Sequence, residues 1–488
     1  MFLKHSIPVS AKQAPLSRLA LASAATALAV ALSACGGSAN IKASTASGPE
    51  LYMSLAMAGS VSSGTSAATL STFSIDDTKN AFAQTTYGFS DTQSGAQVQN
   101  SGNIAAPALQ RGLLTLDLAY QCGTRTTNGC TGVSYPTNPP QVGGWALELA
   151  GQAGGFAQIL GSPFVPLLAA NSCPSMTTAE PFQFVTLPQP LLSTGTALGE
   201  WNPQLETAYG SVNISASGTT VTLNSISQYV LTVNNTGQYV AAGGSPSSPL
   251  AASVTGACGS TVYGNLVSVP AQTTINNSGN EPVNEPATFG IGPSGLLVGN
   301  NGENASSATS SGATPSYQND LGAGSGVIGL PKPTSAVDTT ALVGKQFLGF
   351  YYGTGTLPSD TDWASAPVSF GFSSLPSNCA SDVAPQTGTM IYGGDFTNND
   401  PTASTTGYGN CDFAVDLGTE DAKNYGLYPN ATVYVGSKFS ANATGATYNF
   451  PTVAIAGQLN GKYAIFLIGV DTAGSPKRAW GIYLLQSN

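Results

Sequence analysis

The sequence has 488 residues, with 14 Lys and Arg against 24 Asp and Glu, and a formal charge of −10 at pH 7. Its one histidine is His5, so the rest of the chain offers no histidine for a Ser-His-Asp triad, a zinc site or a haem ligand. Lys and Arg are absent between Thr126 and Pro331. Such an acidic chain repels phosphate backbones, and we expect no nucleic-acid partner.

The chain begins with a charged segment followed by an apolar one. Residues 1–18 carry three basic residues and no acid, and residues 19–34 contain only Ala, Leu, Val, Ser and Thr. This order is typical of a secretory signal, and the run is shorter than the roughly 20 apolar residues of a membrane-spanning helix. It ends in "LSAC" at 32–35, which resembles the lipobox of bacterial lipoproteins. An ordinary cleavable signal with an incidental cysteine is the alternative.

The lipobox resemblance has consequences for residues 1–50. It implies that Cys35 is diacylated, that residues 1–34 are removed, and that residues 35–50 form a flexible tether. Two or three acyl chains, palmitate among them, give lasting attachment to a membrane. Gly36, in place of Asp, implies export to the outer membrane, on its periplasmic or surface face. The whole chain is also similar to uncharacterised Gly- and Ser-rich lipoproteins of proteobacteria, which implies no activity.

Beyond residue 50, the dominant pattern is alternation of apolar and polar residues. It occurs in "LLTLDLAY" at 113–120, "TTVTLNSI" at 219–226 and "CDFAVDLG" at 411–418. Alternation with period two predicts strands of antiparallel sheets that have one wet face. Turn signals separate the runs at 234–238, 292–295, 458–462 and 471–477. We therefore predict an all-β protein.

Six cysteines remain besides Cys35, and an even number in an exported protein favours disulfides over a metal site. Neighbour pairing is the simplest of the possible arrangements: Cys122 with Cys130, Cys173 with Cys258, and Cys379 with Cys411.

The alternating runs divide into two antiparallel modules of barrel or sandwich type. We predict an N-terminal domain at 51–333, with a polar insertion near 300–320, and a C-terminal domain at 338–488. Residues 287–299 resemble 463–474, which suggests a duplication; a single larger sandwich or propeller is the alternative. The second module has about eight apolar runs, enough for a small barrel, and the last three suggest strands buried on both faces.

Ser437 and Lys438 are adjacent, and neighbouring strand residues point to opposite faces. Paired carboxylates remain as candidates for catalysis, because a glycosidase needs two acids. Asp360 and Asp362 lie on one face if extended, beside Trp363, and Asp412 and Asp416 share a face. Solvated surface acids are the simpler interpretation. We assign no catalytic residue.

Other polar and aromatic residues allow a ligand role without establishing one. Asp395 and Asp400 in "DFTNND" are weak calcium candidates that do not match an EF-hand loop, so no metal site is assigned. Glu281 and Glu285 fall in a Pro-rich segment that suits a surface loop or a partner-binding loop. Aromatic residues of the second module could form a ligand platform or simply the core: Tyr351, Tyr352, Trp363, Tyr425, Tyr428 and Trp480.

The sequence thus predicts a lipid-anchored envelope lipoprotein whose ectodomain acts in binding, adhesion or structure. We expect no cofactor, a membrane contact through the N-terminal lipid, and an unidentified protein or glycan partner. A carboxylate-dependent glycoside hydrolase and a barrel that carries a small apolar ligand are the alternatives.

Overall fold

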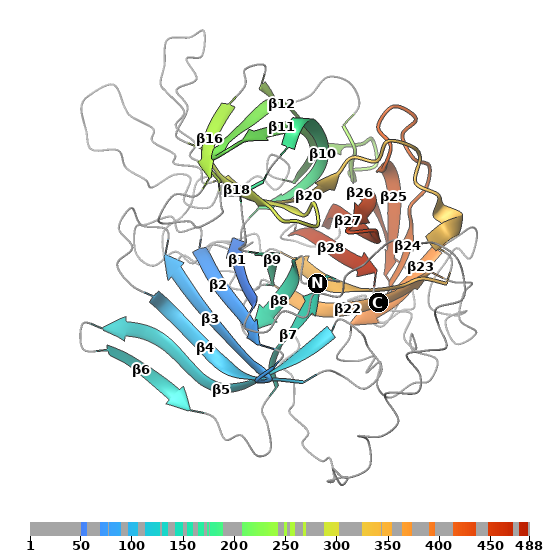
Figure 1. Ribbon diagram of the computed structural model, residues 1–488. Coiled ribbons are helices and arrows are strands. Elements are labelled where there is room, and N and C mark those ends of the chain that lie inside the picture. Colours follow the sequence, from blue (N-terminus) through green and yellow to red (C-terminus); the bar gives the residue numbers. More distant parts are fainter. Residues whose placement is uncertain are drawn as a thin grey trace, which may run out of the picture.

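The computed structural model consists almost entirely of β strands (Figure 1), which confirms the predicted fold class. The one helical element described is a 3-10 helix, η1 (Thr339–Leu342). No helix in the described ranges is long and apolar enough to span a membrane. The structure describes residues 50–55, 69–76, 78–88, 96–105, 113–126, 129–134, 142–149, 154–159, 164–169, 173–174, 176–188, 207–242, 248–250, 254–258, 267–269, 287–301, 325–342, 344–353, 364–372, 390–395, 413–435, 448–471 and 478–486, in part as backbone only.

The first sheet contains the first nine strands. The strands pair antiparallel in the order β4-β3-β2-β1-β9-β8-β7-β5-β6. Because β9 pairs with β1 and β4 also pairs with β5, the sheet closes on itself, and β6 is added beside β5. The strands are β1 (Glu50–Leu55), β2 (Thr69–Asp76), β3 (Ala81–Gly88), β4 (Ala96–Ala105), β5 (Leu113–Thr126), β6 (Gly129–Ser134), β7 (Val142–Glu148), β8 (Gly155–Ile159) and β9 (Val165–Ala169).

The second sheet follows the same plan, with β20 returning to pair with β10. A separate hairpin, β13–β14, projects between β12 and β15. The strands are β10 (Met176–Pro188), β11 (Ala208–Ser217), β12 (Thr220–Val230), β13 (Thr232–Val233), β14 (Tyr239–Val240), β15 (Ser248–Leu250), β16 (Val254–Cys258), β17 (Val267–Val269), β18 (Ala287–Ile291), β19 (Leu297–Asn301) and β20 (Ser325–Pro331). Residues 51–333, predicted as one module, thus hold two sheets.

The third unit is a closed barrel in which each strand pairs with the next and β28 pairs with β21. Its eight strands correspond to the eight apolar runs of the C-terminal module. They are β21 (Gln346–Gly353), β22 (Ala364–Phe372), β23 (Met390–Asp395), β24 (Phe413–Asp416), β25 (Leu427–Val435), β26 (Tyr448–Leu459), β27 (Lys462–Asp471) and β28 (Arg478–Gln486).

Local turn chemistry fixes several of these connections. Asn460 and Gly461 have φ values of 49° and 74° and join β26 to β27, as expected for an Asn-Gly turn. Asn234 accepts backbone hydrogen bonds from Thr236 and Gln238 in the β13–β14 turn. The predicted turns at 234–238, 292–295 and 458–462 are therefore present, whereas 472–477 lies outside the described residues.

The two segments compared as a duplication are not equivalent elements. Residues 287–299 form β18, a turn and most of β19, whereas residues 462–471 form the single strand β27. The difference arises at the turn Gly292–Gly295, where Gly295 has a φ of 90° and its N–H donates to the Gly292 carbonyl. No such turn interrupts β27.

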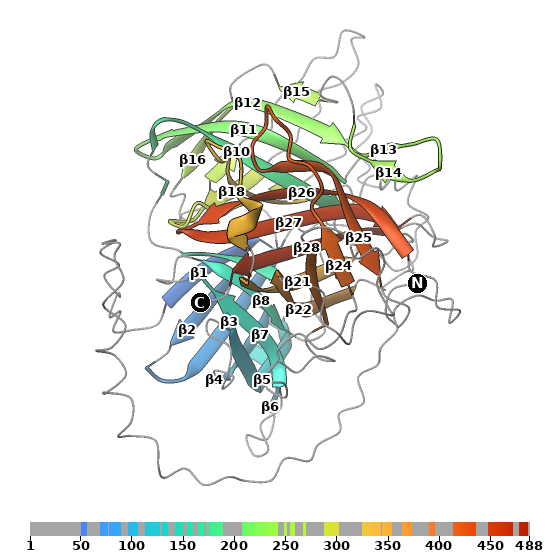
Figure 2. The same cartoon turned by 90° about the vertical axis from the view of Figure 1, so that its right-hand side faces the viewer.

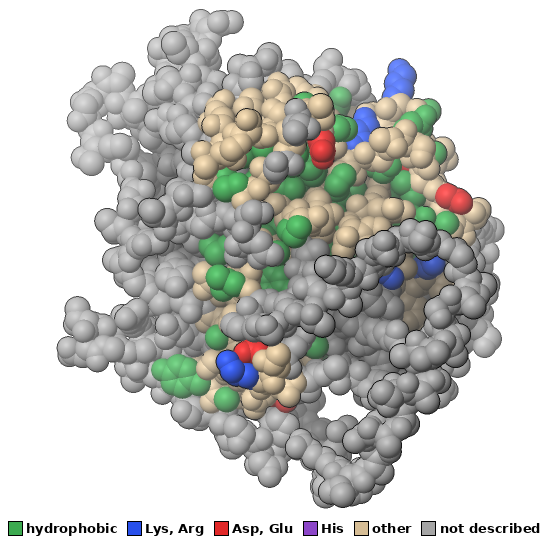
Figure 3. All heavy atoms as spheres, in the orientation of Figure 1, with side chains coloured by type: hydrophobic (Ala, Val, Ile, Leu, Met, Phe, Trp, Pro, Cys, Tyr) green, Lys and Arg blue, Asp and Glu red, His purple; other side chains and the backbone are tan. Residues whose placement is uncertain are grey.

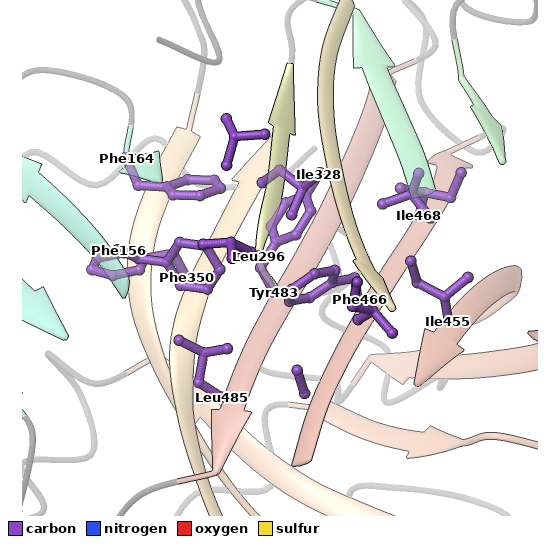
Figure 4. Close-up of a cluster of buried hydrophobic side chains, with 14 of the residues drawn as sticks. Phe156, Phe164, Leu296, Ile328, Phe350, Ile455, Phe466, Ile468, Tyr483 and Leu485 are labelled. Carbon is purple, nitrogen blue, oxygen red and sulfur yellow. The ribbon is translucent and has the colours of Figure 1, made fainter. Parts of the chain in front are cut away.

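The three units share one hydrophobic core that lies between them (Figures 1 and 4). On β27, Ile465 and Leu467 face the barrel interior, while Phe466 and Ile468 face this shared core. Both faces of β27 are therefore buried, as the unbroken apolar run predicted. Representative contributors are Leu147 and Phe156 from the first sheet, Val185 and Ile328 from the second, and Phe350, Phe466 and Tyr483 from the barrel.

Aromatic rings from distant parts of the sequence meet in the shared core (Figure 4). Phe164 stacks on Phe350, with ring centroids 5.5 Å apart, and its centroid lies 5.1 Å from that of Tyr483. Phe156 packs edge-on against Phe350 and Phe466 at 6.4 and 6.1 Å. Because aromatic burial contributes strongly to stability, these contacts bind the first sheet to the barrel.

One of the expected disulfides is described. Cys173, just before β10, is bonded to Cys258 at the end of β16, and the Cα atoms are 5.8 Å apart. In the β5–β6 hairpin, Cys122 lies opposite Gly132 and Cys130 opposite Arg125, so these two positions are on adjacent strands. The side chains of Cys122 and Cys130, and all of Cys379 and Cys411, lie outside the described residues.

Candidate binding surface

In its described interior, the C-terminal barrel holds a cluster of its own buried side chains. Its buried residues include Phe347, Tyr351, Tyr428 and Trp480, and Leu342 of η1 joins the same cluster. Trp480 packs edge-on against Phe450, with ring centroids 6.4 Å apart. Three of the aromatic ligand candidates are thus core residues, while Tyr425 is 36% exposed.

The first sheet also buries a compact interior, and a polar contact lies beside its apolar residues. The Tyr52 hydroxyl donates to Glu148 Oε1 at 2.6 Å. Tyr52 is completely buried among apolar residues such as Phe73 and Leu167. Burial makes this hydrogen bond structurally important, since an unpaired buried hydroxyl is costly.

A polar junction joins the barrel to the second sheet, and we call residues 417–426, between β24 and β25, the clasp loop. The amide nitrogen of Gln183 on β10 donates to the Tyr425 carbonyl at 2.6 Å. Glu420 Oε1 accepts from the backbone N–H of Val337 at 3.0 Å and of Gly426 at 2.5 Å. A single carboxylate oxygen therefore binds both the segment that connects the second sheet to the barrel and the end of the clasp loop.

The clasp loop is ordered by a local turn and by one lysine. Asp421 Oδ1 accepts from the backbone N–H of Lys423 and Asn424, each at 2.8 Å, which is the pattern of an Asx turn. Lys332 Nζ donates to Asn424 Oδ1 at 3.0 Å. Lys332 is the first basic residue after the long stretch that lacks them, and it is used here for an interdomain contact.

A tyrosine pair lies beside the clasp loop on the second sheet. The rings of Tyr209 and Tyr229 are stacked 5.3 Å apart, and the Tyr209 hydroxyl donates to the Ala242 carbonyl at 3.1 Å. Burial, with smaller contributions from Tyr229 and Asp421, raises the pKa of Tyr209 to about 12. Tyr209 is therefore neutral at ordinary pH; it belongs to the shared core, and Tyr229 packs against that core.

From this tyrosine pair outward, the outer face of β11 and β12 is entirely polar and uncharged. The register places Ser211 opposite Ser227, Asn213 opposite Ser225, Ser215 opposite Thr222, and Ser217 opposite Thr220. We call these eight residues the polar ribbon. They are exposed or half-buried, and β11 and β12 lie on the side of the molecule away from β1–β9 (Figures 1 and 2).

Among the acidic residues singled out in the sequence, Asp416 is the one whose side chain is described. Asp416 Oδ1 accepts from the Gly418 N–H at 2.9 Å, a turn contact. Asp395 ends β23 as backbone only, while Cys35, Asp360, Asp362, Trp363, Asp400, Asp412, Glu281 and Glu285 lie outside the described residues. Within the described ranges, no group of three or more His, Cys, Asp or Glu side chains could hold a metal ion.

Sequence reasoning missed the residues that form the junction and the ribbon. The roles of Gln183 and Glu420 could not be predicted from the residues around them, because each forms a hydrogen bond with a backbone group far away in the sequence. The ribbon did leave a signal, since "SVNISAS" and "TTVTLNS" place Ser, Thr or Asn at nearly every outward position. Alternation alone could not show that the two polar faces adjoin.

No family model and no curated protein matches this chain. Three solved structures illustrate the matches found. Intact Ap-TbpB (N and C lobes) is 9% identical over 90% of this chain and 77% of that one, with a TM-score of 0.22. Transferrin binding protein B from serogroup B Neisseria meningitidis is 9% identical, covering 91% and 77%, with a TM-score of 0.23. A mutant of that protein from Haemophilus parasuis Hp5 is 9% identical, covering 90% and 76%, also at 0.23. At these TM-scores, no property of these proteins is transferred to this chain.

Proposed function

We propose that this chain is a lipid-anchored protein of the cell envelope whose ectodomain binds a macromolecule through its outer surface. The observation that carries the proposal is the packing of the three units, whose described interiors hold clusters of buried side chains and whose facing sides share one apolar core. A rigid body of this kind presents preorganised surfaces, which lowers the entropic cost of binding a partner.

The packing favours surface binding over the carriage of a small apolar ligand. A carrier barrel needs a cavity, whereas Tyr428, Phe347 and Trp480 occupy the described barrel interior. Of the acid pairs proposed for glycoside cleavage, Asp416 is described, and it caps a turn. The buried barrel cluster and the turn contact of Asp416 therefore support a binding role more directly than either alternative.

The anchor is tested by the intact mass of the protein purified from its native membrane, with and without reduction and alkylation. We expect a chain that starts at Cys35 with added acyl mass, and six thiols that are alkylated only after reduction. An unlipidated start would contradict the anchor. Free thiols without reduction would contradict the disulfides.

The binding role is tested by native mass spectrometry of the same preparation, released gently from detergent. A carrier would retain a small apolar molecule with defined mass, whereas a surface-binding ectodomain would not. Recovery of such a molecule in stoichiometric amount would contradict the proposal and favour a cavity.

A further inference from the structure

The polar ribbon on β11 and β12 differs from an ordinary solvated sheet face in its uniform chemistry. Each of its four cross-strand pairs consists only of Ser, Thr or Asn. An exposed strand face normally mixes charged residues with polar ones, because charge favours solubility and discourages edge pairing. In the view of Figure 3, tan and green side chains make up most of the described surface, with a few blue and red ones among them.

Hydrogen bonds hold three side chains of the ribbon, Asn213, Ser225 and Ser215, in place. The Asn213 amide donates to Ser225 Oγ at 2.8 Å, and the Asn224 amide donates to Ser215 Oγ at 3.1 Å. Asn213 and Ser225 are both exposed. The ribbon is therefore a preorganised array of hydroxyl and amide groups, with donors and acceptors directed outward.

Aromatic residues lie at one end of this array. The stacked pair Tyr209 and Tyr229 occupies the next register position before Ser211 and Ser227. The exposed Tyr425 lies close by, since its carbonyl accepts from Gln183, which is in register with Ser211. Tyrosine combined with Ser and Asn gives a rigid contact area together with adaptable hydrogen bonding.

The chemistry of the ribbon selects among partners. An anionic polymer is disfavoured, because no Lys or Arg occurs between residues 126 and 331. A stable protein interface needs an apolar centre, and none of the eight ribbon positions carries a large apolar side chain. A partner rich in hydroxyl groups and without charge satisfies both conditions.

We propose that the polar ribbon, with the exposed Tyr425 at its end, binds a polysaccharide of uncharged sugars. This inference deepens the proposed function, since it names the class of macromolecule that the ectodomain takes. Sugar hydroxyls pair with Ser, Thr and Asn groups along the strands, and a sugar ring packs on an exposed tyrosine.

The experiment is affinity electrophoresis of the full chain in detergent through gels that contain dextran, galactomannan or mixed-linkage β-glucan. A uronic-acid polymer serves as the charged counterpart. The test variant is Asn213→Lys, which removes the hydrogen bond to Ser225 and places a bulky charge in the middle of the ribbon. The matched control is Asn235→Lys in the exposed β13–β14 turn, where the same substitution lies off the ribbon.

We expect at least one neutral polysaccharide to retard the wild-type chain and the Asn235→Lys variant equally. Asn213→Lys should weaken this binding by about tenfold or more, which is the loss expected for one hydrogen-bonded contact. Equal thermal unfolding of the two variants shows that folding is intact. If Asn213→Lys fails to fold, Ser225→Lys replaces it.

Three results overturn the inference: no retardation by any neutral polysaccharide, equal retardation of both variants, or preference for the uronic-acid polymer. Loss of binding to an envelope protein in the Asn213→Lys variant alone would instead assign the ribbon to a protein partner. Each of these leaves the lipid anchor untouched, because the intact mass measures it independently.

Discussion

At the scale of single residues, two buried tyrosines differ in whether their hydroxyl group forms a hydrogen bond. Tyr52 donates to Glu148 at 2.6 Å. Tyr483 is completely buried in the shared core, and its hydroxyl has no hydrogen-bond partner in the described structure. Burial of an unpaired hydroxyl costs free energy, whereas a paired one contributes. The same chemical change should therefore have opposite effects at the two positions.

We predict that Tyr52→Phe lowers the free energy of unfolding by about 1–3 kcal/mol, because the hydrogen bond from the Tyr52 hydroxyl to Glu148 is lost. Tyr483→Phe should be neutral or stabilise by up to about 1 kcal/mol, since only an unsatisfied group is removed. Urea unfolding of the two variants measures both values. A clear destabilisation by Tyr483→Phe would mean that its hydroxyl has a partner.

The buried tyrosines also predict the behaviour of the protein at alkaline pH. Burial raises the pKa of Tyr483 well above its usual value and that of Tyr209 to about 12. Above pH 10, the unfolded chain loses these protons while the folded protein keeps them. The free energy of unfolding should be unaffected by these groups below pH 10, and fall by about 1.4 kcal/mol per pH unit for each tyrosine above it.

Chemical unfolding on either side of pH 10 checks this expectation. Tyr209→Phe provides the comparison, because it removes one of the responsible groups. Its stability should fall less steeply between pH 10 and about 12, the pKa of Tyr209. Equal slopes for wild type and variant would contradict the role of Tyr209.

Glu420 is the carboxylate of the clasp loop, and its effect is tested by removal. Glu420→Ala should lower the free energy of unfolding by about 2 kcal/mol, because the N–H groups of Val337 and Gly426 lose a charged acceptor. Glu180→Ala is the matched control, since Glu180 is exposed on β10 and surface substitutions usually change stability by less than about 0.5 kcal/mol. Similar guanidinium midpoints for both variants would show that the clasp adds little.

At the scale of elements, the closure of the barrel depends on close approach between β21 and β28. A Cβ atom on Gly349 would lie 1.7 Å from the Tyr483 carbonyl oxygen, which is backbone and cannot move aside cheaply. Gly344 has a φ of 77°, but nothing lies within 4 Å of its Cβ position. The first glycine is needed for space, and the second for backbone conformation.

We predict that Gly349→Ala destabilises the protein by about 3 kcal/mol or more, because the strands must separate. Gly344→Ala should cost about 1 kcal/mol, the strain of a left-handed conformation. Thermal unfolding of both variants measures the difference. The same cost at both sites would mean that the β21–β28 pairing tolerates extra width.

At the scale of the whole molecule, the shared core makes the three units depend on one another. Outward-facing residues of the barrel, such as Phe350, Phe466 and Tyr483, are fully buried only because the two sheets cover them. An isolated barrel would present these side chains as a large apolar patch, which favours aggregation.

We therefore predict that residues 334–488 expressed alone are insoluble or associate, while the full chain unfolds in one calorimetric transition. Analytical ultracentrifugation of the fragment and calorimetry of the full chain provide the two readouts. A monomeric, cooperatively folding fragment would contradict the interdependence.

The sequence by itself determined the class of structure and many of its local features. Alternating residues specify strands because side chains of a strand point to opposite faces, and Asn460 with Gly461 specifies a tight turn because both adopt positive φ. Only the tertiary structure decided what each face contacts. Phe466 and Ser211 both point outward from their sheets, yet one lies in the shared core and the other on the polar ribbon. The alternating pattern shows which residues share a face of a strand. What covers that face depends on packing and on hydrogen bonds between distant segments, such as the one from the Val337 N–H to Glu420.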